Sequence, residues 1–349
     1  MFDVIITNTS SFKFVLPTSP KKIFLYLSQY PRKRWSIIVT LKDIADICGV
    51  STSTVSRAFD KNSRISQPVR QRILSCASEL GYTPNLIARS LKKNRTFTIA
   101  LIIPSIENRF YIDVLQHLEI TLQRYGYKLL VTFVQNGITT ERDCLEMAAS
   151  AQVDGIIILS ETLENQHYIK QLLKNFKIIQ LFNAPYSQID SVTMNDIGGT
   201  EIGTNYLLQK GHRRILFLGG DRRISGFWKA IDDAQIPHDN LLALTSLISV
   251  DELCAEINRF RPTAIFSIAT ASETAWLAIR KLGFSVPDDI SILAYDNSQW
   301  INLLGLTAIA HNLEEITSEL VTLLMKRLNE DDFLPVQHLV LEPFIIERN

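Results

Sequence analysis

The sequence of 349 residues has little of what metal sites, disulfide frameworks and membrane spans require. Its four cysteines are widely spaced, with no CxxC pair and no histidine at metal-ligand spacing, which is typical of buried thiols in a reducing cytoplasm. No apolar run approaches the roughly 20 residues that a transmembrane helix needs. We therefore expect no metal site and no membrane partner.

The sequence also lacks the signatures of common enzymes. No GxGxxG follows a first strand, and there is no phosphate-loop lysine motif, no GxSxG and no cysteine–histidine pairing. The apolar run KKIFLYL near the N-terminus is too short for a secretion signal and is followed by PRKRW. These absences favour a cytoplasmic protein that is not an enzyme and needs no cofactor.

The net charge is zero, but the charges are unevenly distributed along the chain. Residues 39–95 hold ten basic and four acidic side chains, and residues 1–38 hold six basic and one acidic. The remaining 20 basic and 31 acidic side chains belong to residues 96–349. A basic first quarter followed by an acidic body indicates a head that binds nucleic acid.

The stretch LKDIADICGVSTSTVSRAF, residues 41–59, predicts two short helices joined by a tight turn. Apolar residues recur at helical spacing as far as Cys48, Gly49 suits a sharp helix ending, and Ser51 is a good N-cap for the next helix. Hydroxyl side chains then crowd the helix start, where they can bind phosphates or base edges, and Arg57 follows one turn later. This arrangement is typical of a helix-turn-helix, although the hydroxyls alone could equally be ordinary surface caps.

Three further segments flank this motif. Residues 68–80, PVRQRILSCASEL, predict a third amphipathic helix that starts at a proline and is closed by Gly81. Residues 85–97, NLIARSLKKNRTF, predict either a linker or a short basic helix that forms only against a partner helix or DNA. Residues 1–38 show no clear period, so we expect a poorly ordered extension and hypothesise that it reflects an upstream start assignment.

From residue 98 onward, apolar strands alternate with amphipathic helices. The alternation runs from TIALIIP to KIIQLF and then restarts, ending in ISILAYD. Strands that alternate with helices predict parallel sheets covered on both faces, and two consecutive α/β units predict two lobes. In such sheets ligands bind beyond the carboxyl ends of the strands.

Several motifs resemble the lactose/galactose repressor (LacI/GalR) family of bacterial transcription regulators, and they follow one another in the family's order. They are TLKDIADICGVSTSTVSRAF, ELGYTPNLIARSL, VDGIII, KGHRRILFLGG, PTAIFS and VPDDISILAYDN. The resemblance begins at about Val39 and reaches the C-terminus. It implies an α/β protein in which an all-α helix-turn-helix headpiece and a hinge helix are joined to a two-lobed, periplasmic-binding-protein-like core of parallel sheets.

The resemblance also implies domain boundaries. The extension would span residues 1–38, the DNA-binding headpiece residues 39–84, and the hinge helix with its linker residues 85–97. Residues 98–349 would form the effector-binding and dimerisation core. Its N-lobe would comprise about 98–195 with 312–338, and its C-lobe about 196–311 with 339–349.

Site residues follow from the resemblance position by position. Thr52, Ser53 and Arg57 resemble base-reading residues, and Leu91 resembles a hinge leucine that wedges between base pairs in the minor groove. The full set of implied DNA-binding residues is Thr40, Ser51, Thr52, Ser53, Thr54, Arg57, Asn85, Ala88, Leu91 and Lys92. The implied effector-binding residues are Phe110, Tyr111, Asn183, Arg223 and Asp296. We expect Asp196 to cap a helix rather than to touch the effector.

The sequence departs from the family pattern around the cleft. The loop from Gly220 to Arg223 is short, Ala269-Thr270 replaces the usual Asn-Asp, and Arg109 replaces a proline. These changes make a sugar effector less certain and leave the DNA-binding head unaffected.

The resulting hypothesis is a homodimeric repressor of a carbohydrate-utilisation operon that binds pseudo-palindromic double-stranded operator DNA. A small effector, for which a sugar is the first candidate, would control it by binding one lobe arrangement better than another. The C-terminal EPFIIERN has no leucine heptad, which favours a dimer over a tetramer. The alternatives are a cytoplasmic solute-binding receptor with no DNA role and a regulator that responds to a non-sugar metabolite.

Overall fold

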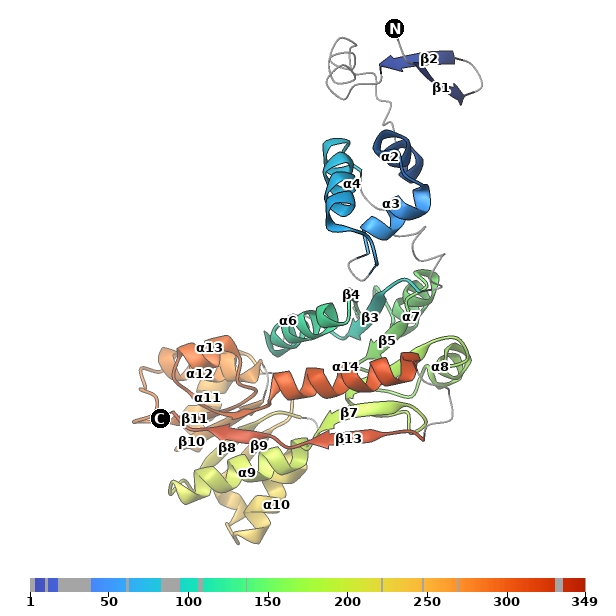
Figure 1. The fold of residues 1–349 in the computed structure, drawn as a ribbon. Coiled ribbons are helices and arrows are strands. Elements are labelled where there is room, and N and C mark those ends of the chain that lie inside the picture. The colour runs from blue at the N-terminus through green and yellow to red at the C-terminus, as the bar shows by residue number, and fades with distance from the viewer. Residues whose placement is uncertain are drawn as a thin grey trace. The chain divides into compact units, whose positions relative to one another are not determined.

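The computed structural model describes residues 4–9, 12–17, 39–60, 63–82, 95–105, 109–135, 137–220, 222–246, 248–268, 270–329 and 335–348. The chain divides into two compact units, Met1–Leu86 and Ile87–Asn349 (Figure 1). Among the described residues, no helix has the length and apolar character needed to cross a membrane.

A hairpin precedes the predicted headpiece. Strand β1 (Val4–Thr9) pairs antiparallel with β2 (Phe12–Pro17), and Thr9 lies opposite Phe12. Both strands are rich in β-branched and aromatic residues, which favour extended backbone. The sequence led us to expect a poorly ordered extension, whereas the structure describes a hairpin at these twelve positions. The other residues of the extension lie outside the described part of the chain.

The headpiece consists of three helices, as the sequence predicts. They are α2 (Leu41–Cys48), α3 (Thr52–Ala58) and α4 (Gln67–Glu79). Gly49 ends α2 with a φ of 61°, a left-handed conformation that glycine adopts without steric cost. Ile44, Val55 and Ile73, one from each helix, are completely buried and form the centre of the core. Each short helix is therefore stabilised mainly by this shared packing.

The N-lobe is a six-stranded parallel sheet in the order β13-β7-β6-β5-β3-β4. Its strands are β3 (Thr98–Ile103), β4 (Lys128–Phe133), β5 (Gly155–Ile158), β6 (Lys177–Phe182), β7 (Asp190–Met194) and β13 (His338–Leu341). Its helices are α6 (Arg109–Arg124), α7 (Glu141–Ser150), α8 (Gln166–Leu172) and α14 (Leu313–Asn329). Alternate side chains of the strands face opposite ways, so Leu101 packs with α6 and α14 whereas Ile102 packs with α7 and α8.

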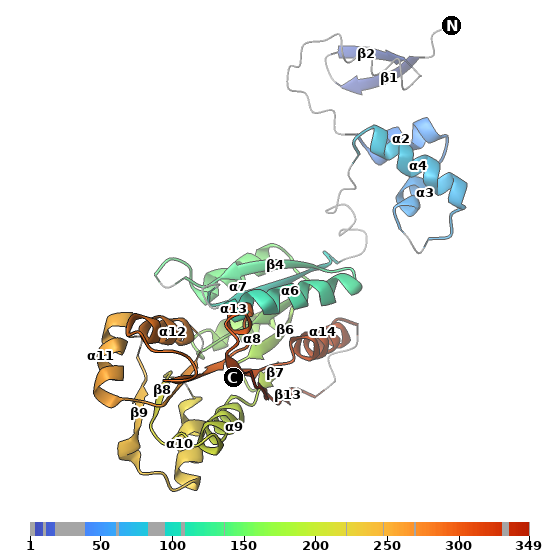
Figure 2. The ribbon, with the colours of Figure 1, turned by 90° about the vertical axis from the view of Figure 1, so that its left-hand side faces the viewer.

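The C-lobe sheet has the order β14-β12-β11-β10-β8-β9, with only β14 antiparallel. Its strands are β8 (Ile215–Leu218), β9 (Leu241–Leu244), β10 (Ala264–Ile268), β11 (Ser291–Tyr295), β12 (Thr307–Ala310) and β14 (Phe344–Ile346). Its helices are α9 (Asp196–Gln209), α10 (Ile224–Asp233), α11 (Val250–Phe260), α12 (Ala271–Lys281) and α13 (Gln299–Leu303), with the short turn η1 (His238–Asn240). One face of the sheet packs against α9 and α10 and the other against α11 and α12 (Figure 2).

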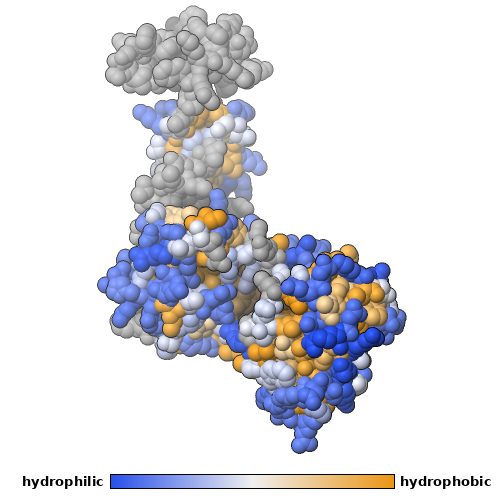
Figure 3. Space-filling model, turned by 180° about the vertical axis from the view of Figure 1, so that it is seen from behind, coloured by the Kyte–Doolittle hydropathy of each residue, from blue (hydrophilic) through white to orange (hydrophobic). Residues whose placement is uncertain are grey.

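Three segments connect the two lobes: they follow β7, β12 and β13. The first and third are bonded to each other, because the Asn195 amide donates to the Leu341 carbonyl at 2.9 Å and the Asn195 side chain donates to the Glu342 carboxylate at 2.9 Å. Because β13 pairs with β7, the N-lobe extends to Leu341 and not only to residue 338 as expected. Hydrophilic and hydrophobic side chains are interspersed over the visible surface of this unit (Figure 3).

Helices α9 and α10 approach each other at a glycine. A Cβ atom at Gly226 would lie 2.1 Å from the carbonyl oxygen of Ile197, which belongs to the backbone of α9 and cannot rotate away. Gly226 therefore sets the spacing of the two helices.

Replacing Gly226 with alanine should destabilise the C-lobe by about 1–3 kcal/mol, because overpacking forces the helix backbones apart. Urea unfolding followed by circular dichroism measures this change. Lys229→Ala is the matched control, because Lys229 lies exposed on the same helix and its substitution adds no atom to the contact. Equal stabilities of the Gly226→Ala and Lys229→Ala proteins would contradict the close-packing argument.

Candidate functional site

The start of α3 presents hydroxyl groups that bond to one another. The Ser51 Oγ accepts the Thr54 backbone N–H at 3.1 Å and lies 2.8 Å from the hydroxyls of both Ser53 and Thr54. The Thr40 hydroxyl caps α2 in a reciprocal arrangement with Asp43, to which it donates at 2.7 Å. Thr40 and Ser51 thus have a structural role, whether or not they also contact DNA.

Arg57 differs from its basic neighbour Arg70. The Arg57 side chain is exposed on α3, and its guanidinium makes no hydrogen bond or ion pair with any other described residue. Arg70 instead donates to the carbonyls of Ala58 at 3.0 Å, Asp60 at 2.7 Å and Ser63 at 2.9 Å, which fixes the segment after α3. Thr52 and Ser53 share the exposed start of the helix, so these two and Arg57 form the available polar surface. The other predicted DNA-binding residues, Asn85, Ala88, Leu91 and Lys92, lie outside the described residues.

An aromatic cluster lines the N-lobe side of the cleft. Phe110 and Tyr111 begin α6, and the ring of Phe110 lies 5.3 Å from that of Phe182 at the end of β6. The ring of Tyr111 lies 6.4 Å from that of Phe182. Phe182 has a φ of 65°, which is strained for an aromatic residue, and such strain is concentrated at functional sites. Asn183 follows this residue, so it lies beside the cluster.

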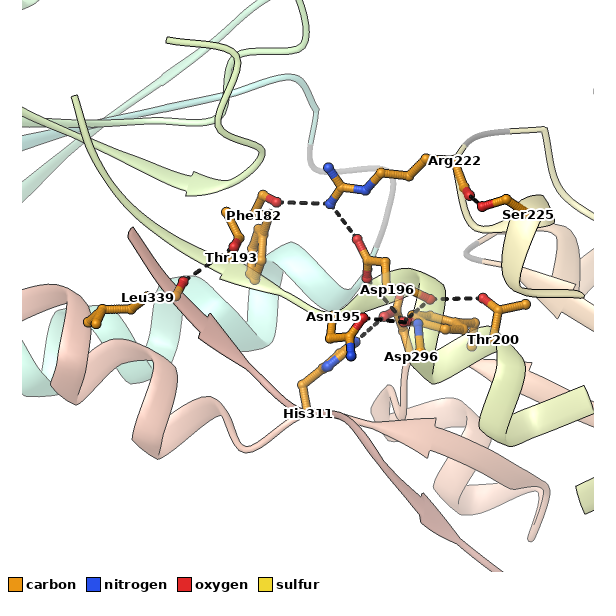
Figure 4. A network of polar contacts seen from close by, with 12 residues as sticks. Phe182, Thr193, Asn195, Asp196, Thr200, Arg222, Ser225, Asp296, His311 and Leu339 are labelled. Carbon is orange, nitrogen blue, oxygen red and sulfur yellow. Dashed lines mark hydrogen bonds and ion pairs between the residues drawn. The ribbon is translucent and has the colours of Figure 1, made fainter. Parts of the chain in front are cut away.

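Asp296 provides a carboxylate from the C-lobe. It follows β11, is 7% exposed and has a φ of 77°. Its Oδ1 lies 3.4 Å from the Nε2 of His311, which follows β12 and whose ring is 5.7 Å from that of Phe110 (Figure 4). The Nδ1 of His311 is buried and has no hydrogen-bond partner among the described residues. His311 therefore connects Phe110 of one lobe with Asp296 of the other.

Two neighbouring arginines enter the cleft in different ways. The guanidinium of Arg223 lies over the ring of Tyr295, 4.9 Å from its centroid. The Nη2 of Arg222 donates to the Asp196 carboxylate at 2.5 Å and to the Phe182 carbonyl at 3.0 Å (Figure 4). The Tyr295 hydroxyl donates to the other Asp196 oxygen at 3.0 Å.

The expectation that Asp196 caps α9 is wrong. Asn195 is the cap, because its side-chain oxygen accepts the Gly198 N–H at 3.0 Å. Asp196 is the next residue, and its carboxylate is turned toward Arg222 and Tyr295. Two adjacent residues thus have different roles: Asn195 caps α9, and Asp196 makes the ion pair with Arg222.

The structure brings together four of the five predicted effector residues. Phe110, Tyr111, Arg223 and Asp296 belong to one group of aromatic and charged side chains, whereas the Asn183 side chain has no polar contact with the described members of that group. Further members of the group were not predicted from the sequence; they are Phe182, Asp196, Arg222, Tyr295 and His311. The apolar run TAIA could have been predicted as a strand, and His311 directly follows it, at a position where cleft residues are expected.

Two of the residues that depart from the family pattern, Arg109 and Thr270, border a small pocket at the same cleft. It is lined by Arg109 of the N-lobe and, from the C-lobe, by Thr270, Glu273, Tyr295, Asp296, Ser298, Trp300 and Ile301. The Nε of Arg109 lies 3.3 Å from the Glu273 carboxylate, and both side chains are largely exposed. The arginine that replaces a proline thus makes an ion pair between the lobes.

Burial and the nearby Asp296 carboxylate raise the pKa of Tyr111 to about 12. The phenol is therefore a neutral hydrogen-bond donor at ordinary pH. Together with the Asp296 carboxylate, which accepts hydrogen bonds, it can bind a hydroxyl group on a ligand.

Raising the pH above about 10, the ordinary tyrosine pKa, should lower the free energy of unfolding. The folded-state pKa of Tyr111 lies above the unfolded value, so its contribution is full below pH 10 and is lost as the pH approaches 12. Tyrosinate absorbance should show a step near pH 12, where buried Tyr186 also titrates, and Tyr111→Phe should reduce that step by the contribution of one tyrosine. Tyr125→Phe, which changes an exposed tyrosine on the segment after α6, should leave that step in place. An unchanged titration curve in Tyr111→Phe would contradict the assignment.

Comparisons with known proteins agree with this architecture. Residues 40–85 match the family described as bacterial regulatory proteins, lacI family, and residues 204–349 match the periplasmic binding protein-like domain. The HTH-type transcriptional regulator DegA of Bacillus subtilis (strain 168) is 30% identical over 298 residues, which cover 80% of this chain and 88% of that protein. The HTH-type transcriptional repressor PurR of Vibrio atlanticus (strain LGP32) is 28% identical over 333 residues, which cover 89% and 98%.

Solved structures show the same fold. The lac repressor bound to ONPG in the repressed state superposes with a TM-score of 0.74 at 22% identity, covering 89% of this chain and 98% of the other. The complex of the transcriptional regulator CelR with cellobiose gives a TM-score of 0.60 at 24% identity, covering 89% and 99%. These relatives are regulators and not enzymes, as the sequence predicted. The chain belongs to the lacI family of bacterial regulatory proteins.

Proposed function

We propose that the protein is a homodimeric repressor whose binding to operator DNA is controlled by a small effector held between the two lobes. The observation that carries the DNA function is the exposed surface of Thr52, Ser53 and Arg57 on the helix that follows the Gly49 turn. A helix placed in this way enters the major groove and presents these side chains to the bases. Such a repressor acts on DNA in the cytoplasm.

Symmetry sets the form of the DNA site. Two identical headpieces read two half-sites, so the operator is pseudo-palindromic, with half-sites spaced by the DNA helical repeat. Relatives named as repressors support repression over activation. The proposed hinge residues Asn85, Ala88, Leu91 and Lys92 would add contacts in the minor groove, where Leu91 would be the apolar wedge.

The effector class follows from the chemistry of the cleft. A buried carboxylate at Asp296 accepts hydrogen bonds from hydroxyl groups, the Tyr111 phenol donates one, and aromatic rings pack against the apolar faces of a sugar. Solved structures of similar regulators contain bound cellobiose or ribose. A sugar effector and a carbohydrate-utilisation operon are therefore the proposal.

Two alternatives to a sugar-controlled repressor make different predictions. A planar non-sugar metabolite such as a nucleoside could stack on the same rings, and the replacement of the usual Asn-Asp pair by Ala269-Thr270 removes a polar contact that a sugar would use. A receptor without a DNA role would not need the exposed Arg57.

The first experiment is fluorescence-anisotropy binding of a pseudo-palindromic DNA library at one fixed salt concentration, repeated with panels of sugars and of nucleosides. A selected symmetric site that one sugar releases or tightens would support both parts of the proposal. If a nucleoside instead of a sugar changed the DNA affinity, the effector would be a nucleoside and the sugar proposal would be wrong. Failure to select any symmetric site would contradict the DNA function.

Replacing Arg57 with alanine should cost about 1–3 kcal/mol of binding free energy at one base pair, the value of a bidentate contact with guanine. Affinities for single-base operator variants measure this loss. Arg72→Ala is the control for lost charge, because Arg72 is exposed on α4, away from the predicted reading surface. If Arg57→Ala weakened binding to all sequences equally, Arg57 would contact phosphate instead of a base.

A further inference from the structure

One side chain ties the two lobes together across the cleft. Arg222 lies between β8 and α10 of the C-lobe, yet its Nη2 donates to the carbonyl of Phe182, the last residue of β6 in the N-lobe, at 3.0 Å. The same nitrogen donates to the Asp196 carboxylate of α9 at 2.5 Å. A single guanidinium therefore binds one acceptor from each lobe.

Both acceptors are held in place independently of Arg222. The left-handed backbone of Phe182 fixes the direction of its carbonyl, and its ring packs against Phe110 and Tyr111. The Asp196 carboxylate is anchored by the Tyr295 hydroxyl and is 15% exposed. A planar guanidinium, whose N–H groups point in fixed directions, fits such a fixed pair of acceptors better than a flexible ammonium would.

A second arginine also joins the lobes, but it belongs to the N-lobe and its partner to the C-lobe. Arg109 of the N-lobe binds Glu273 of the C-lobe beside the small pocket that Trp300 and Asp296 also line. Because both of these side chains are largely exposed, water and salt screen the pair, and it is the weaker of the two contacts.

We infer that Arg222 is a latch that holds the lobes closed when no effector is bound, and that the Arg109–Glu273 pair supports it. Arg222 occupies the Phe182 carbonyl and the Asp196 carboxylate, two acceptors that a ligand in the open cleft could use. An effector that uses either acceptor must displace Arg222, which makes this residue a determinant of effector affinity. The contact between the lobes does not depend on the proposed repressor function, whereas the role of Arg222 in effector affinity rests on it.

Trp300 allows the latch to be tested without DNA or effector. Acrylamide quenching of tryptophan fluorescence is measured on the full-length protein, with and without a Trp300→Phe substitution. The difference between the two signals gives the quenching of Trp300, and the same pair of measurements is made for each variant. We expect Arg222→Ala to raise the ratio of open to closed molecules by about fivefold, the change expected for loss of one partly exposed ion pair. Quenching and the radius of gyration from X-ray scattering should both increase. Guanidinium chloride at low millimolar concentration should reverse these changes, whereas NaCl at equal ionic strength should not.

Matched variants separate the latch from general loss of charge. Lys229→Ala removes an exposed ion pair with Glu201 that lies within the C-lobe, so quenching should stay at the wild-type value. Asp196→Asn removes the carboxylate partner and should open the cleft even if Arg222→Ala folds poorly by circular dichroism. Wild-type quenching in folded Arg222→Ala or Asp196→Asn, or equal opening in Lys229→Ala, would overturn the inference.

Discussion

The geometry of parallel strands is the constraint on which the effector site depends. In each lobe all strands except β14 run in one direction, so the segments that follow them meet at one edge of the sheet. Both of these edges supply residues to the same cleft. The cleft residues that follow strands in this way are Asn183, Asp196, Arg222, Asp296 and His311, and Phe182 is the last residue of β6.

The cleft combines rigid and exchangeable contacts. The aromatic cluster and the strained backbone at Phe182 and Asp296 are held by packing, whereas Arg222 and Arg109 are joined to their partners by partly exposed polar contacts. Packed surfaces resist continuous deformation, but an ion pair can be replaced by a ligand. This division lets the lobes keep their internal structure while the interactions between them change.

Much of the fold could be predicted from the sequence, and the reasons for the failures are local. Helical spacing located α2, α3 and α4, and apolar runs located β3, β5 and β11, because burial imposes a clear pattern on such segments. Strands β7 and β12 are short and contain polar residues, so they were missed, and His311 was missed with them. Arg223 was predicted to bind the effector, and its guanidinium lies over the ring of Tyr295, but no sequence rule could show that adjacent Arg222 makes the contact between the lobes. That choice depends on the path of the loop.

The two units differ in how much of the chain must be synthesised before they can fold. The headpiece is formed from consecutive residues, whereas the N-lobe needs α14 and β13 from near the C-terminus to cover its core and complete its sheet. During translation, α2, α3 and α4 can pack soon after they leave the ribosome, while apolar strands of the N-lobe wait for residues 313–341. A ribosome that stalls near the end of the mRNA would therefore carry a nascent chain with a folded DNA-binding head and an incomplete, aggregation-prone core.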